Sequence, residues 1–351
     1  MRITRRHLQV SLGSLWLLDG VLQCQPIMFS KVFARHILAP AGSGQPITIA
    51  APLRLVRDLI SAQPALFNAI VVVIQLTLGI ALVTRRFNRA ALAGSIVWAL
   101  SVWVVGEGVG GLTTGATLLT GAPGAAVLYA VIAALAWPTR EDLGDERPSR
   151  LALPAWCALW LTGAGLELIH GNNSSGAISM ALRDARSSAP RWIAGIDGHL
   201  GALRIPSWTA GGLSAVFVLV AIWALVPGVT RQLSVGIGTL LSLTAWFLFQ
   251  GLGDVTSGRS TDPNAGPLIV LLALAVIGAH SPGTEQQPVD GVAISESTAV
   301  TSLATTSSSK TPFIGQLTNG KPAFDWHEDG DGALLTARSP EGCLSSNSVA
   351  R

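Results

Sequence analysis

Hydrophobic residues along this chain gather in long uncharged blocks, separated by shorter polar and basic segments. A helix needs roughly 18 to 20 apolar residues, at about 1.5 Å per residue, to cross the ~30 Å hydrocarbon core of a bilayer. Several blocks reach that length. The pattern predicts eight transmembrane helices, at 8–29, 66–83, 90–109, 121–137, 151–169, 208–226, 233–252 and 266–279.

Basic residues in the short connections predict how these helices are oriented. Cytoplasmic connections carry an excess of Lys and Arg, and placing the N-terminus inside puts every short basic connection on that side. Both termini are then cytoplasmic, and 139–150 is a charged cytoplasmic linker. The residues concerned are Arg85, Arg86, Arg89, Arg140, Arg147, Arg150 and Arg231.

Two longer connections, 30–65 and 171–207, lie on the outer side in this topology. Each contains a short amphipathic piece, at 53–60 and at 177–185. We expect these pieces to form helices on the membrane surface. Lids that gate access of a ligand are the alternative.

A shift of about 143 residues aligns the chain with itself. The segment from Trp103 to Gly115 falls on the segment from Trp246 to Gly258, with a Trp, two glycines, a Thr-Thr or Thr-Ser pair and a closing Gly in register. The alignment predicts two repeats, 1–138 and 151–280, each of four helices. Because each repeat makes an even number of crossings, the repeats are parallel.

The composition changes after 280, where Ser, Thr, Gly and Pro dominate. Such a segment buries too little apolar surface to offset the loss of chain entropy. We predict a disordered, cytoplasmic tail over 281–351.

The overall composition excludes several classes of protein. Hydrophobic residues make up 49% of the chain and charged residues only 12%, about half the charge density usual in soluble domains. The net charge of +3 comes from dispersed clusters, so nucleic-acid binding is not expected. Three distant cysteines, Cys24, Cys157 and Cys343, have neither the spacing of a redox pair nor that of a zinc site. No metal site is predicted.

Polar side chains inside the apolar spans are the candidates for function. A charged group at the centre of a bilayer costs roughly 2.5 to 3.5 kcal/mol, so such groups usually face the protein interior. Asp19 and Gln23 are four residues apart, on one helical face with Trp16. The candidate binding residues are Asp19, Gln23, Gln75, Glu107, Glu167, Gln250 and Asp254.

In the repeat alignment, Gln23 falls on Glu167 and Glu107 falls on Gln250. Each half therefore keeps one acid and one amide at equivalent positions. These groups could form hydrogen bonds between helices, or they could hold a shared proton. The nearby glycine run 106–111 follows a helix rather than a strand, which argues against a dinucleotide-binding turn. A turn at the membrane surface, a close helix contact and a backbone exposed to substrate remain open.

The segments Leu15–Gln23, Ile74–Gly79 and Gly106–Gly108 resemble bacterial multipass proteins of the broad DoxX/DoxD-like four-helix class. The resemblance covers about 280 residues, with one four-helix unit per repeat. Some members of that class are subunits of a thiosulfate:quinone oxidoreductase, and others belong to oxidative-stress complexes. No catalytic residue of the class matches a position in this chain.

We therefore expect a multipass protein of the bacterial cytoplasmic membrane, not an enzyme, which binds or transports a small solute between its repeats. Its partners are the lipid bilayer and a membrane subunit. The first alternative is a quinone-linked redox subunit, with quinone as cofactor and proton transfer by Glu107 and Glu167. A membrane assembly scaffold is the second alternative.

Overall fold

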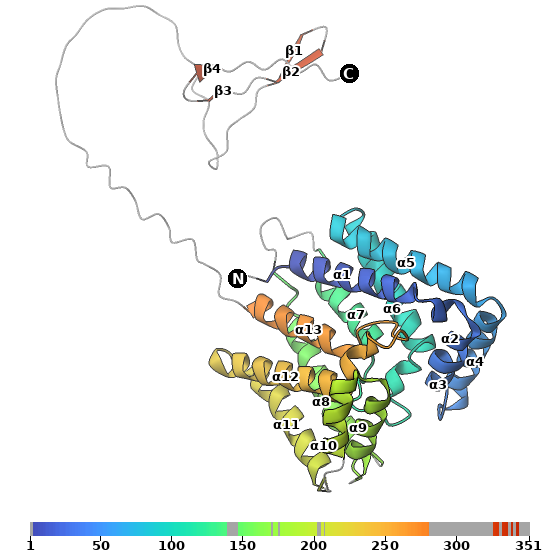
Figure 1. The fold of residues 1–351 in the computed structure, drawn as a ribbon. Helices are drawn as coiled ribbons and strands as arrows, with labels where there is room; N and C mark the ends of the chain where they lie inside the picture. Colours follow the sequence, from blue (N-terminus) through green and yellow to red (C-terminus); the bar gives the residue numbers. More distant parts are fainter. Residues whose placement is uncertain are drawn as a thin grey trace, which may run out of the picture. The chain divides into compact units, whose positions relative to one another are not determined.

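The computed structural model describes residues 3–138, 147–169, 171–174, 176–201, 205–206 and 208–280, together with 326–329, 332–335, 338–339 and 342–343. The chain divides into two compact units, Met1–Thr284 and Glu285–Arg351. The described elements of the first unit are all helical (Figure 1), which confirms the predicted all-α class for this part of the chain. Residues 139–146 of the predicted linker, 139–150, lie outside the described residues.

Helices form at all eight predicted positions. They are α1 Arg5–Gln23, α5 Pro64–Thr84, α6 Asn88–Val105, α7 Ala125–Leu135, α8 Ala152–Leu168, α11 Thr209–Leu225, α12 Val229–Leu248 and α13 Ala265–His280.

The connections hold the remaining elements, and both amphipathic pieces are helical as predicted, within α4 and α9. The elements are η1 Pro26–Phe29, α2 Lys31–Phe33, the π-helical segment η2 Ala34–Leu38, α3 Ala39–Ala41, α4 Ile47–Ala62, η3 Val109–Gly111, α9 Ala177–Ser188, α10 Arg191–Gly201 and η4 Gly251–Asp254.

Two of the described helices, α5 and α6, are long and apolar enough to cross a membrane. Helices α7, α11 and α13 are also apolar but shorter. The 11 residues of α7 cover only about 16 Å at about 1.5 Å per residue. The predicted span 121–137 is therefore too long as a helix.

Several predicted helix ends are also wrong, and the backbone explains why. Helix α1 ends at Gln23 because a short 3-10 turn begins at Pro26. Helix α6 ends at Val105, since Gly108 and Gly110 have φ of +56° and +62° in the following turn. The glycine run therefore forms a turn, and Gly110 within it also packs closely against Pro123.

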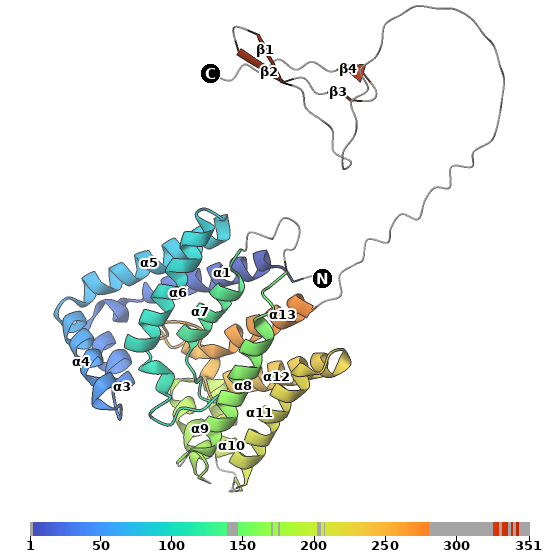
Figure 2. The ribbon, with the colours of Figure 1, turned by 180° about the vertical axis from the view of Figure 1, so that it is seen from behind.

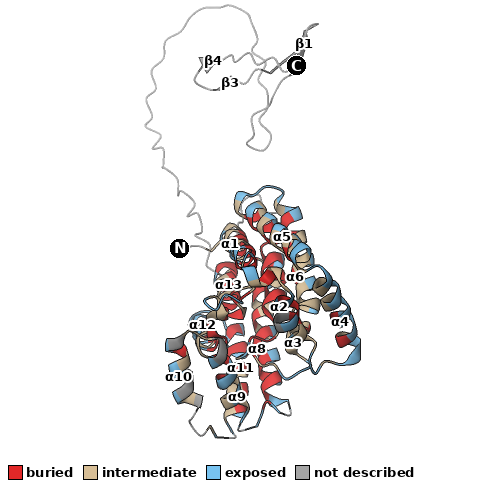
Figure 3. Ribbon diagram, turned by 45° about the vertical axis from the view of Figure 1, so that its right-hand side comes forward, coloured by how far each residue is buried: buried red, intermediate tan, exposed pale blue. Residues whose placement is uncertain are grey.

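Helices α7 and α13 lie in the middle of the first unit (Figure 1 and, from behind, Figure 2). Helix α7 packs against α6, α1 and α13, and α13 also packs against α8 and α12. On either side, α1 packs against α5 and α8 packs against α11. One hydrophobic core joins all eight helices, and Figure 3 colours its buried residues red.

Glycines allow α1 and α5 to approach closely. A Cβ atom added at Gly79 would lie 2.8 Å from the Gly13 carbonyl oxygen and 2.6 Å from Leu17 Cγ. Small residues at a helix crossing permit such contact between backbones.

The second unit contains two short antiparallel strand pairs. Strand β1 Trp326–Asp329 pairs with β2 Gly332–Leu335, and β3 Arg338–Ser339 pairs with β4 Gly342–Cys343. These strands were not predicted from the sequence. The rest of the tail predicted to be disordered, 281–351, lies outside the described residues.

We predict that Gly79→Ala destabilises the protein by about 1 to 3 kcal/mol, because the new methyl group would force α1 and α5 apart. Gly165→Ala in α8 is the matched control, since a Cβ atom there meets nothing within 4 Å. Thermal unfolding of the two purified variants would measure the difference. Equal midpoints for both variants would contradict the close packing of α1 on α5.

Candidate ligand-binding site

A cavity of about 470 Å³ lies among α1, α4, α5, α6 and α7, and the loop before α13 contributes to its lining. Cavities that hold small ligands in proteins usually measure roughly 300 to 1,000 Å³. This cavity is therefore large enough for a small organic molecule.

Most of the wall is apolar or aromatic. Val56, Leu59 and Ile60 of α4 form one side, so this helix covers the cavity. Trp16 and Tyr129 pack together with ring centroids 4.3 Å apart. The aromatic side chains of the lining are Trp16, Phe33, Phe67, Trp98 and Tyr129.

Four of the seven predicted residues line this cavity, namely Asp19, Gln23, Gln75 and Glu107. Asp19 and Gln23 lie on one face of α1, as predicted from their spacing, and both are buried with at most 4% of their surface exposed. Gln75 comes from α5. Glu107 comes from the turn after α6 and is only partly buried.

Five further polar residues line the cavity and were missed, namely Asn68, Ser101, Tyr129, Thr261 and Asp262. Asn68 and Tyr129 lie within predicted spans, and Tyr129 is the single tyrosine of the chain, so both carried a signal that could have been used. Asp262 lies in a polar loop of the second half. Only the three-dimensional fold brings Asp262 next to residues more than a hundred positions earlier.

Many buried polar atoms around the cavity have no hydrogen-bond partner among the described residues. Buried polar groups in proteins are nearly always paired, so each such atom calls for a ligand or water. Most of these atoms are acceptors. Those that belong to lining residues are Gln23 Oε1, Asn68 Oδ1, Gln75 Oε1, Glu107 Oε2 and Trp98 Nε1, whereas the side chains of Asp19 and Tyr129 interact with each other.

Hydrogen bonds fix the positions of several of these side chains. Asn68 donates from Nδ2 to the Gln23 carbonyl oxygen at 2.8 Å. Glu107 Oε1 accepts from the amide of Ala126 at 2.9 Å, at the first turn of α7. Carboxylates are favourable at that end of a helix. The amide of Ala125 also acts on this carboxyl group.

The described residues that line the cavity include three carboxyl groups, Asp19, Glu107 and Asp262, and no Lys, Arg or His. Burial, followed by the negative charge of Asp262, raises the pKa of Glu107 to about 8, although the amides of Ala126 and Ala125 act in the opposite direction. Burial also raises the pKa of Asp262, against hydrogen bonds from Thr261 and Asn264. These groups share an environment poor in water and in positive charge.

The remaining predicted residues lie elsewhere. Gln250 and Asp254 line a second cavity in the other half. Glu167 is buried in α8, with 1% exposed, and is absent from the described lining of both cavities. Within the described residues, no three His, Cys, Asp or Glu side chains are grouped to hold a metal ion.

The aligned segments of the two halves make the same contact. Trp103 Nε1 donates to the Pro123 carbonyl oxygen at 2.7 Å, and Trp246 Nε1 donates to the Pro263 carbonyl oxygen at 2.7 Å. Helices α7 and α13 begin two residues after these prolines. The same contact between a tryptophan and a proline carbonyl group therefore precedes both central helices.

No protein-family model, curated protein or solved structure matches this chain. The resemblance to the DoxX/DoxD-like class stays a prediction from its short motifs.

We predict that the Glu107 carboxyl group is largely protonated at pH 7 and ionises near pH 8, because its raised pKa means that the neutral form persists below that pH. Infrared difference spectra would follow the C=O stretch of the protonated acid between pH 4 and pH 10. The component centred near pH 8 should vanish in Glu107→Gln and persist in Asp58→Asn. A loss of that component centred near pH 4 to 5 would contradict the assignment.

Proposed function

We propose that this chain is a multipass membrane protein of eight helices in two parallel four-helix repeats, and that its first half binds a small lipophilic organic cation. The observation that carries the ligand class is the apolar cavity with three carboxyl groups, unpartnered acceptors and no basic side chain among its described residues.

Apolar stripes on the outside of the bundle support the membrane location. Leu66, Val73 and Ile80 are seven residues apart on α5, and each has more than half of its surface exposed. Soluble monomers rarely expose continuous apolar surface of this kind. Similar exposed residues on the other outer helices are Val97 and Val104 on α6, Leu219, Ile222 and Leu225 on α11, and Leu233 and Leu240 on α12.

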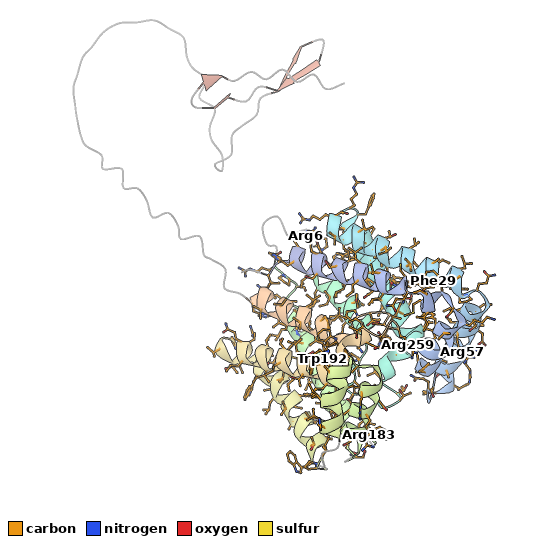
Figure 4. The ribbon with its side chains drawn as sticks, viewed as in Figure 1. Arg6, Phe29, Arg57, Arg183, Trp192 and Arg259 are labelled. Carbon is orange, nitrogen blue, oxygen red and sulfur yellow. The ribbon has the colours of Figure 1, made fainter. Side chains whose placement is uncertain are left out.

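Arginines at equivalent helix ends support the proposed orientation. Arg6, at the start of α1 in Figure 4, donates to the carbonyl oxygens of Leu82 and Val83 at the end of α5. Arg231 donates to the carbonyl oxygen of Ala224, 2.8 Å away, near the end of α11. A cation is favourable at the C-terminal end of a helix. Both arginines lie on the side proposed to face the cytoplasm.

The helix contacts support the repeat. Helix α1 packs on α5 and α6 packs on α7, and in the same order α8 packs on α11 and α12 packs on α13. The short helix α7 suits a membrane setting because the turns before it lie against other protein segments, where non-helical backbone is tolerated at membrane depth.

A lipophilic cation matches both the apolar walls and the carboxyl groups of the first cavity. Its apolar body would contact the aromatic and aliphatic walls, and aromatic faces attract cations directly. Its positive charge would offset the cost of ionising a carboxyl group there. An anion would meet three acids and unpaired acceptor atoms, so the site disfavours it.

A quinol is the second candidate, because its apolar ring suits the same walls and its hydroxyl groups could donate to Glu107. Only one of the two acids expected in that reading, Glu107, lines the cavity. The quinol reading therefore has weaker support than the cation.

We predict that the protein stays in the membrane fraction under alkaline carbonate extraction, because its apolar stripes contact lipid. In a variant without native cysteines, Asp58→Cys on α4 should react with an impermeant maleimide in intact cells. Arg86→Cys should react only after permeabilisation, since the α5–α6 turn faces the cytoplasm in this topology. Release by carbonate, or labelling of Arg86→Cys in intact cells, would overturn the proposal.

We predict that the purified protein binds benzyldimethylammonium, which carries one N–H donor, and discriminates against isobutylbenzene, which has the same shape with carbon in place of the charged nitrogen. Equilibrium dialysis against protein-free micelles would measure both. Asp19→Asn and Glu107→Gln should each weaken binding of the cation at least about tenfold, which corresponds to about 1.4 kcal/mol.

Asp58→Asn is the matched control, because this carboxylate is exposed and pairs with Arg57, a residue that Figure 4 labels on α4. It should leave the affinity unchanged. Equal affinity for the charged and uncharged compounds would overturn the cation proposal. Preferential binding of a short-chain quinol, lost in Glu107→Gln, would favour the quinol reading instead.

A further inference from the structure

A second cavity, of about 690 Å³, lies in the other half of the bundle, against α9 and the segment that follows α12. The loop between α6 and α7 closes it with Thr114, Gly115 and Thr120. This cavity differs in character from the first. Hydroxyl, amide and carboxyl groups make up much of its lining, and its described aromatic residue is Phe249.

Gln250 supplies the decisive observation. Its side chain lines the cavity and has 7% of its surface exposed. Its Nε2 donates to the Leu119 carbonyl oxygen at 3.2 Å, so the amide is held in one orientation. Its Oε1 has no partner among the described residues. An unpartnered acceptor on a residue that lines a polar cavity calls for a donor from a ligand or from water.

Carboxyl groups provide further hydrogen-bond acceptors in this cavity. Asp254 and Asp184 both line the cavity, and Asp254 Oδ1 is a second buried acceptor with no partner within the described residues. Arg259, which Figure 4 labels in the loop after η4, acts electrostatically on Asp254. Arg259 is not part of the described lining, which contains no Lys, Arg or His.

We propose that this second cavity is a separate site for a small hydrophilic organic cation that carries N–H donors. Ammonium hydrogens would pair with Gln250 Oε1 and with the carboxyl group of Asp254. The polar lining would replace the water around such a cation, whereas the first cavity is too apolar for that purpose. The first site would thus take cations with a large apolar body, and the second would take compact cations with several N–H donors.

The second site does not depend on the ligand of the first. No predicted binding residue lines both cavities, and the described linings of the two cavities do not overlap. The two proposals can therefore fail separately.

The test is binding of putrescine, compared with 1,4-butanediol, which has hydroxyl groups in place of the two ammonium groups. Calorimetric titration of the full-length protein in detergent should detect putrescine binding that is at least about tenfold tighter than butanediol binding. Gln250→Leu removes the unpartnered acceptor, and Asp254→Asn removes a charge while keeping its shape. Asn also tolerates the left-handed backbone of Asp254, at φ +56°.

Each variant should weaken putrescine binding at least about tenfold, whereas Asp58→Asn and Asp19→Asn should not change it. Thermal unfolding midpoints within a few degrees of the unmodified protein would show that the variants are folded. If Gln250→Leu does not fold, the milder variant Asp254→Asn decides the outcome. Equal binding of putrescine and butanediol, no binding of putrescine, or binding unchanged in Asp254→Asn would each overturn the proposal.

Discussion

The hydrogen bond from the Trp103 indole to the Pro123 carbonyl oxygen, with its counterpart from Trp246 to Pro263, controls where the polar loops of this fold are placed. Each bond ties the end of a long helix to the start of a central one and so closes the loop between them. Closure places Glu107 against the first turn of α7. It also holds Asp262, the residue before Pro263, at the wall of the first cavity. Without these two bonds, both loops would lose the anchor that directs their polar groups inward.

The loops can pack so tightly because glycine takes the positions where a side chain has no space. Gly110 lies against the Pro123 carbonyl group and Gly253 against Pro263, and both have positive φ. A Cβ atom at either position would overlap the proline backbone. These paired glycines therefore have a steric role, and the recurrence of the glycines in the alignment follows from the shared contact with proline.

The sequence was sufficient to predict the all-helical class and the approximate places of eight helices, because each corresponds to an uncharged apolar block. It was also sufficient to place Asp19, Gln23 and Trp16 on one face, since helical spacing decides that question. The length of α7 was not predictable in the same way. Apolar residues continue through 121–124, but Gly121 and Gly124 have φ above +100° there, and hydrophobicity does not report backbone conformation.

The residues that line the first cavity were predictable only in part, because a local sequence pattern does not report contacts between distant segments. Asn68 and Tyr129 are polar groups within apolar blocks, and the cost of burying them was a usable signal. Asp262 gave no such signal, because an Asp before Pro in a polar loop is usual at a protein surface. Its burial depends on contacts between the two halves, which no local pattern contains.

Each half contributes a loop to the lining of the cavity in the other half. Thr261 and Asp262, from the second half, line the first cavity, and Thr114 and Thr120, from the first half, line the second cavity. Ser260 Oγ lies 2.6 Å from the carbonyl oxygens of both Gly253 and Asp262, so a single hydroxyl group links a residue of the second cavity to one of the first. Because a hydroxyl group has one hydrogen, it donates to one of these carbonyls at a time. Either half alone would leave its cavity without the loop that closes it, so both halves are needed to form the two cavities.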